Sequence, residues 1–157
     1  MTEPSFLADR PAFFACAPEF DPVDYVNINS GVMLMNLPAL RRDLAGFRTF
    51  FLELFARSLA LDQVAYQRFY AGRWDRLRPE ANWKPYWGEN AAAEIVHFHG
   101  PKPAAVRKYL ADPGHKLLPS WRELLDRGGP AYQAFLWEWT QYRALADLAT
   151  GRTDGLP

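Results

Sequence analysis

The stretch Gly31-Val32-Met33-Leu34-Met35-Asn36 is a continuous apolar run, preceded by Asn29-Ser30 and followed by Leu37-Pro38. A run of this length is typical of a strand that is covered on both faces, as in the sheets of α/β proteins. Residues 12–16 form a second short apolar run, and Pro18, Asp21 and Pro22 then interrupt it. Because these strand-like runs alternate with helical patterns, the sequence predicts the α/β class.

Helical spacing begins soon after the first stretch. Pro38 suits the first turn of a short helix. The apolar side chains that follow recur at steps of three and four residues, which predicts a helix with the phenylalanines on one face. The apolar residues are Phe47, Phe50, Phe51, Leu54 and Phe55, and Ser58 or Leu59 takes the next position of the same pattern. Asp62 is expected to cap a second helix over 63–70 that ends at Gly72, and 74–77 is expected to be a short strand ended by Pro79.

The last third of the chain is predicted to be helical. A strand over 94–99 precedes it and stops at Gly100-Pro101. Ser120 and Glu123 have the spacing of a capping box, and Gly128 suits a helix end. Pro130 begins a longer helix that ends at Gly151. Its expected apolar stripe consists of Tyr132, Phe135, Leu136, Trp139 and Tyr142.

Composition narrows the class of protein. The 157 residues suit one domain, and an apolar share of 49% argues against disorder. Eighteen basic residues balance 18 acidic ones, which argues against the broad basic surface of a nucleic-acid or polybasic membrane-surface protein. The single cysteine, Cys16, excludes an internal disulfide and is expected to be a buried strand residue. With no apparent signal or membrane span, the chain is expected to be soluble, reduced and cytoplasmic.

Two adjacent segments contain residues suited to binding a metal ion and a phosphate. In a strand, His97 and His99 would point to the same face and could share a metal, or they could simply satisfy local hydrogen bonds. The following Gly100-Pro101-Lys102 could bind a phosphate through backbone N–H groups and the lysine charge, or could be a turn with a solvated lysine.

Other polar and aromatic residues suggest sugar chemistry. Asp62-Gln63 could hold sugar hydroxyls and stabilise a positive charge at a sugar carbon, unless Asp62 is used as a helix cap. Asn27, Asn29 and Ser30 precede an apolar strand, where such residues usually make turn hydrogen bonds. The aromatic residues of 82–88 could stack on a sugar or base, or could belong to the core.

Three of these fragments occur in the order and spacing of one known family. Asn29-Ser30-Gly31-Val32-Met33-Leu34-Met35-Asn36-Leu37 resembles the Asn-x-Gly-Val strand segment of glycosyltransferase family 8, which includes glycogenin and bacterial lipopolysaccharide galactosyl- and glucosyltransferases. Asp62-Gln63 matches the Asp-Gln pair at a helix start in that family. His97-Phe98-His99-Gly100-Pro101-Lys102-Pro103 resembles its closing His-Phe-x-Gly segment. The resemblance covers residues 12–110.

The resemblance implies a partial GT-A-type α/β fold with a helical C-terminal region. It also implies a metal-dependent, retaining enzyme that moves a hexose from a UDP-sugar to a saccharide or lipopolysaccharide-type acceptor, with Mn²⁺ or Mg²⁺ as cofactor. His97 matches the metal-binding histidine, and Gly100 and Lys102 match positions that hold the diphosphate. His99 and Trp83 are expected on the acceptor side.

The same resemblance assigns the donor-sugar residues. Asn29, Ser30, Asp62 and Gln63 match positions that line the donor sugar. Gln63 would lie near the reacting anomeric carbon, and Asp62 would bind sugar hydroxyls. These two are therefore the expected catalytic residues.

The family's Asp-x-Asp metal pair has no counterpart upstream of Asn29, because Asp21 and Asp24 have a different spacing. We therefore expect 12–110 to correspond to the C-terminal half of such an enzyme, with helices of the same domain over 111–151 and loose ends at 1–11 and 152–157. An open sheet edge would favour a homodimer or a missing N-terminal half. The alternative function is a truncated or degenerate family member that binds without turnover. A third hypothesis is an unrelated metal protein that uses His97 and His99.

The expected partners are a nucleotide-sugar donor and a saccharide acceptor, with no nucleic acid and no transmembrane segment. Trp137 and Trp139 lie on different faces of the last predicted helix, so one is expected to be exposed. Exposure there would suit a helix partner or a membrane surface, although few basic residues accompany it. The expected location is cytoplasmic, with peripheral contact to the inner face of the membrane as the further possibility.

Overall fold

The computed structural model describes residue 6 and residues 10–57 and 61–152. The chain divides into two compact units. Unit 1 comprises residues 1–83 and 92–97, and unit 2 comprises residues 84–91 and 98–157. Over the described residues the structure is a mixed α/β fold with a three-stranded sheet and five α-helices, the last three in the C-terminal region. The predicted α/β class is confirmed. Because the units interleave in sequence, no single linker marks them.

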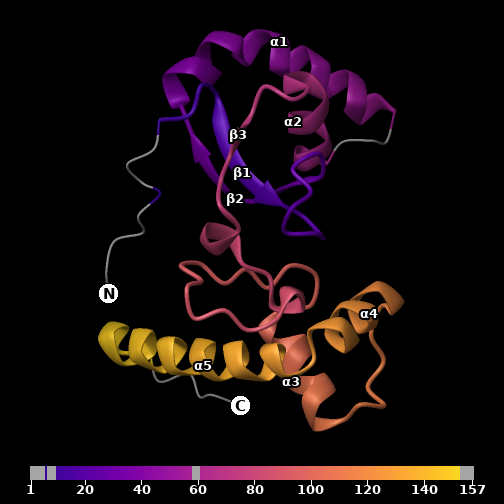
Figure 1. Ribbon diagram of the computed structural model, residues 1–157, viewed down its shortest axis with the longest axis vertical. Helices are drawn as coiled ribbons and strands as arrows, with labels where there is room; N and C mark the ends of the chain where they lie inside the picture. The colour runs from indigo at the N-terminus through magenta and orange to yellow at the C-terminus, as the bar shows by residue number, and fades with distance from the viewer. Residues whose placement is uncertain (1–5, 7–9, 58–60, 153–157) are drawn as a thin grey trace. The chain divides into compact units, whose positions relative to one another are not determined.

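Unit 1 is built on a sheet with the strand order β2-β1-β3 (Figure 1). The strands are β1 (Phe14–Pro18), β2 (Ile28–Met35) and β3 (Asp75–Arg76). β1 runs antiparallel to β2, with Phe14 opposite Met35, and parallel to β3. The three predicted strands are therefore present, although β1 begins two residues later than expected. β2 begins at Ile28, so it already contains Asn29 and Ser30.

Both faces of β1 are covered, as strand periodicity requires. Phe14 and Cys16 pack on one face with Ile28 and Tyr70, against side chains of α1 and α2. Ala15 packs on the other face with Phe6, Leu77 and Ala81. Cys16 is fully buried, as predicted. The expectation that β2 is also covered on both faces is wrong, because Gly31 in the middle of the strand and Met35 at its end are exposed.

Two helices complete unit 1, namely α1 (Leu37–Ala56) and α2 (Asp62–Tyr70). The Asn36 side chain caps α1 by accepting a hydrogen bond from the N–H of Ala39 at 3.2 Å. The short helix at Pro38 and the phenylalanine helix are therefore one helix, with Pro38 in its first turn. Ser58 and Leu59 lie outside the described residues. α2 ends at Ala71 in the left-handed conformation, rather than at Gly72.

The predicted strand over 94–99 is wrong. Only Val96 makes a bridge, to Trp83. The N–H of Trp83 donates to the Ile95 carbonyl at 2.8 Å, and the N–H of His97 donates to the Trp83 carbonyl at 2.7 Å. The neighbouring chain is the 3₁₀ turn η2 (Pro79–Asn82), which offers no longer strand to pair with. The backbone of His97 is thus joined to unit 1 through this single bridge.

Unit 2 contains the 3₁₀ turn η3 (Pro85–Trp87) and three helices, α3 (Pro103–Ala111), α4 (Pro119–Gly128) and α5 (Pro130–Thr150). Gly128 allows α4 to pack closely, because a Cβ there would lie 2.6 Å from the Tyr132 ring and 2.9 Å from the Tyr86 Cα. The expected capping box is wrong. α4 is capped at Leu118 without a side-chain bond, so Ser120 already lies inside the helix.

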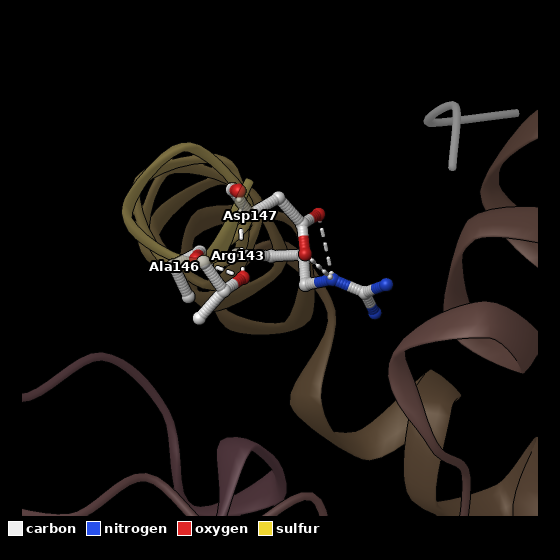
Figure 2. A network of polar contacts seen from close by, with 4 residues as sticks. Arg143, Ala146 and Asp147 are labelled. Carbon is white, nitrogen blue, oxygen red and sulfur yellow. Dashed lines mark hydrogen bonds and ion pairs between the residues drawn. The ribbon is translucent and has the colours of Figure 1, made fainter. Parts of the chain in front are cut away.

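α5 ends at Gly151 in the left-handed conformation, as predicted. In its last turns Arg143 pairs with Asp147 at 2.9 Å, and the Thr150 hydroxyl donates to the Ala146 carbonyl at 2.8 Å (Figure 2). Trp137 is 68% exposed and Trp139 is half-buried, which confirms the difference between their two faces. Among the described helices, none is both long enough and apolar enough to cross a membrane.

Candidate functional site

Polar side chains from five segments of unit 1 form one connected group of hydrogen bonds. We call it the Asn29–Gln63 cluster. It consists of Glu19, Asn29, Ser30, Asp62, Gln63, Asn82 and His97. The cluster unites all four predicted donor-sugar residues with the predicted metal residue His97. Figure 1 shows the strand β2 and the helix α2 that supply most of them.

The side-chain amide of Gln63 connects β2 with Glu19, which follows β1. Its Oε1 accepts from the backbone N–H of Ser30 at 3.1 Å and lies 3.4 Å from Asn29 Nδ2. Its Nε2 donates to the Glu19 carboxylate at 2.6 Å. Because a backbone N–H can only donate, the bond from Ser30 identifies Oε1 as the acceptor and so fixes the orientation of the amide.

Asp62 is not a helix cap. The residue that caps α2 is Leu61, without a side-chain bond, and Asp62 is the first helical residue. The Asp62 carboxylate instead accepts from the Ser30 hydroxyl at 3.1 Å. A carboxylate in the first turn is favoured by the positive end of the helix dipole. Since Asp62 is exposed, its oxygens are accessible to a ligand in addition to that serine bond.

The two asparagines of the cluster are buried. Asn29 Oδ1 accepts from the N–H of Gly31 at 3.0 Å and from Asn82 Nδ2 at 3.0 Å. The remaining oxygen of Asn82 lies 3.0 Å from His97 Nδ1. Since that oxygen can only accept, His97 donates from Nδ1, and a neutral ring then carries its lone pair on Nε2.

The His97 ring lies directly on Gly31. A Cβ at Gly31 would be 2.6 Å from Nδ1 and 2.8 Å from Nε2, closer than real side chains approach. No residue larger than glycine therefore fits there without moving the histidine. The glycine in the Asn-Ser-Gly segment thus has a packing reason that lies 66 residues away in the sequence.

The side chains that could ligate a metal can be compared with those that the expected Mn²⁺ ion needs. Among the described residues, no three His, Cys, Asp or Glu side chains gather into a group that could hold a metal ion. These residues therefore do not fit a complete Mn²⁺ site, and His97 could contribute one ligand through Nε2.

The remaining predicted residues are placed differently. His99 belongs to unit 2, where its Nδ1 lies 3.0 Å from the Tyr86 hydroxyl. Lys102, also in unit 2, is exposed and donates to the Phe98 carbonyl at 2.9 Å. Gly100 has a φ of +79°, which a side chain rarely adopts. Trp83 contributes its backbone to the bridge with Val96 and is half-buried.

Two cluster residues were not predicted from the sequence. Glu19 follows β1 and lies 44 residues before Gln63, so no local motif connects them. Asn82 precedes the aromatic segment and is completely buried. A buried polar side chain must find partners, and an asparagine among apolar neighbours is the signal that could have suggested it.

The cluster carries two carboxylates, that of the exposed Asp62 and that of the half-buried Glu19. Glu19 and Asp62 place two carboxylates around Gln63. Burial raises the pKa of Tyr66 in α2, and the negative charge of Asp62 raises it further. Such a surface favours a ligand with hydroxyl donors or a developing positive charge.

Comparison of the chain with protein-family models, curated proteins and solved structures finds no match in any of the three.

Proposed function

We propose that this chain is a retaining glycosyltransferase of the family 8 type, and that the Asn29–Gln63 cluster is the donor-sugar side of its site. It would move a hexose from a UDP-sugar to a saccharide or lipopolysaccharide-type acceptor. One observation carries the proposal. Asn29 and Ser30 are hydrogen-bonded directly to Asp62 and Gln63, although Ser30 and Gln63 are 33 residues apart in the sequence.

Burial divides the proposed roles within the cluster. Asn29 is 3% exposed and both polar atoms of its side chain are hydrogen-bonded, so it positions Gln63 rather than touching a sugar. Asp62 is exposed and Ser30 and Gln63 are half-buried, so these three would contact the hexose. The Asp62 carboxylate would accept from sugar hydroxyls, which are good partners for an ionised acceptor.

The proposed reaction breaks the bond between the anomeric carbon and the diphosphate oxygen. Positive charge then develops on the sugar and negative charge on the departing UDP. The Gln63 carbonyl and the carboxylates of Asp62 and Glu19 would stabilise the positive charge. The acceptor hydroxyl oxygen forms the new bond on the same face, and its proton leaves with the UDP oxygen.

Several parts of the proposal rest on the resemblance. They are a cofactor role for Mn²⁺ or Mg²⁺ with His97 as one ligand, diphosphate binding by Gly100 and Lys102, and an acceptor side with His99 and Trp83. For Lys102 the proposal requires the ammonium group to exchange the Phe98 carbonyl for a phosphate oxygen. A homodimeric state and a cytoplasmic, membrane-peripheral location belong to the same proposal.

Calorimetry of UDP-glucose, UDP-galactose and UDP tests the donor-sugar assignment. One of the two UDP-sugars should bind more tightly than UDP. In Asp62→Asn the affinity for that UDP-sugar should fall about tenfold, because a hydrogen bond to a charged group is lost. UDP affinity should be unchanged in this variant. Glu138→Gln, an exposed change on α5, is the matched control. Equal affinity for UDP and both UDP-sugars would contradict the assignment.

A second titration tests the metal assignment. UDP binding is measured with and without Mn²⁺ for the wild type and His97→Ala. Mn²⁺ should strengthen binding in the wild type only. Equal responses of the two proteins would remove His97 from the proposed metal site.

A binding module without turnover is the second candidate. The observation that favours it is the lack of a three-ligand metal group among the described residues. Release of UDP from a bound UDP-sugar, measured over hours with saccharide acceptors, separates the two. Binding with no UDP release would favour the module.

A further inference from the structure

The exposed face of α1 combines apolar and cationic side chains in one line. Its members follow one another at steps of three or four residues and therefore lie on one face of the helix. We call this face the α1 ridge. It consists of Leu37, Arg41, Leu44, Arg48, Leu52 and Phe55. α1 runs along one side of unit 1 (Figure 1).

The apolar members of the α1 ridge are not core residues. Leu44 is 58% exposed and Phe55 is 67% exposed, with Leu37 and Leu52 near half. A neighbouring face of α1 already packs against the core through Leu40, Phe47 and the buried Leu54. The helix thus has one apolar face that the fold uses and a second that it leaves open.

The charges on the α1 ridge are all positive. Arg41 and Arg48 alternate with the leucines, and neither makes a hydrogen bond or ion pair with any described residue. The two carboxylates of α1, Asp43 and Glu53, are not three or four residues from either arginine, so they lie off the α1 ridge. A cationic and apolar face of this kind suits a surface that is both anionic and apolar.

We propose that the α1 ridge binds the surface of an anionic phospholipid bilayer. The leucines and Phe55 would enter the headgroup boundary, and Arg41 and Arg48 would keep their guanidinium groups at the phosphates. A second copy of the chain fits less well, because a ridge paired with itself would place arginines together with no carboxylate between them. This inference does not depend on the transferase proposal, but it would supply the membrane contact that proposal includes.

Sedimentation with lipid vesicles tests the inference. The full chain should bind phosphatidylcholine vesicles that contain about 30% phosphatidylglycerol and should not bind pure phosphatidylcholine vesicles. The binding should weaken as salt is added. Replacing both arginines (R41Q with R48Q) should weaken binding about 25-fold, since each basic residue near such a surface contributes about fivefold. Leu44→Glu with Phe55→Glu should abolish binding.

The matched control is Leu145→Glu with Leu148→Glu on α5, where the leucines are similarly exposed and the arginine within the same helical turns, Arg143, is paired with Asp147. It should bind within about twofold of the wild type. Circular dichroism is used to check that each variant is folded. No preference of the wild type for anionic vesicles, or equal losses in the α5 control, would overturn the inference. Concentration-dependent dimerisation that is lost in the Leu44/Phe55 variant, without vesicle binding, would assign the α1 ridge to a second copy instead.

Discussion

Gly31→Ala tests the arrangement of the cluster most directly. An alanine Cβ would lie 2.6 Å from His97 Nδ1 and 2.8 Å from Nε2, so the imidazole must leave its place. The strand backbone itself accepts alanine, since Gly31 is not among the glycines with a positive φ. The whole effect should therefore come from the displaced histidine.

The size of the effect follows from what the displaced ring loses. His97 gives up its hydrogen bond to Asn82, and the Asn82 oxygen is left buried without its donor. A lost hydrogen bond costs about 1 kcal/mol, and an unsatisfied buried acceptor costs about 1–3 kcal/mol, with partial overlap between the two. We expect Gly31→Ala to lower the free energy of unfolding by roughly 2 kcal/mol.

The assay is urea unfolding followed by circular dichroism, arranged as a double-mutant cycle with His97→Ala. His97→Ala alone removes the same bond and should cost about as much. With that ring absent, Gly31→Ala should cost no more than about 0.5 kcal/mol. If the glycine substitution costs equally in both backgrounds, or less than about 0.5 kcal/mol in the wild type, the close contact between Gly31 and His97 is wrong.

Four further substitutions should change the stability by amounts that follow from the contacts each residue makes. Gly128→Ala should destabilise unit 2 by about 1–3 kcal/mol, because the new Cβ would meet the Tyr132 ring and the Tyr86 backbone. Gly46→Ala, with a Cβ 3.4 Å from Phe69, should instead stabilise α1 by roughly 0.5–1 kcal/mol. Urea unfolding compares the two variants, and equal effects would contradict the structure. Tyr132→Phe should stabilise the fold by about 1 kcal/mol, because the buried Tyr132 hydroxyl has no partner among the described residues. Burial raises the pKa of Tyr132 above its ordinary value of 10.0, so the contribution of Tyr132 to stability should be constant below that pH and should fall above it as the unfolded state ionises. Unfolding at rising pH should therefore show a smaller fall in Tyr132→Phe. Arg143→Ala should change stability by less than about 0.5 kcal/mol, because the Arg143–Asp147 pair is partly exposed, and a thermal melt that shifts by many degrees would be inconsistent with this.

The fold was predictable where one physical signal dominated. The apolar run of β2, the apolar spacing in α1 and the glycine at the end of α5 each gave the correct element. Errors arose where two signals competed. Pro119 takes the first helical position of α4, so the Ser120–Glu123 pair lies too late to act as a cap. Residues 94–99 alternate like a strand, but pairing depends on a neighbour, and only Trp83 provides one.

The candidate site was predictable only as a set of residues. Spacing and resemblance selected Asn29, Ser30, Asp62, Gln63 and His97, which the structure joins in one cluster. The partners that complete the cluster, Glu19 and Asn82, come from segments whose proximity depends on the tertiary fold. Sequence spacing carries no information about such contacts. The use of Asp62 was also ambiguous, because a cap and a ligand contact require the same residue type at a helix start.

The direction of the hydrogen bonds has a consequence for how substitutions in this cluster are interpreted. Two backbone donors, the N–H groups of Ser30 and Gly31, orient the amides of Gln63 and Asn29, and through Asn29 they orient Asn82 and His97. Removing the Asn29 side chain would therefore disturb Gln63 and Asn82 together, although Asn29 is too buried to touch a ligand. Loss of sugar binding in Asn29→Ala would show that the cluster must be ordered, whereas loss in the exposed Asp62→Asn, with unchanged stability, would show contact with the sugar.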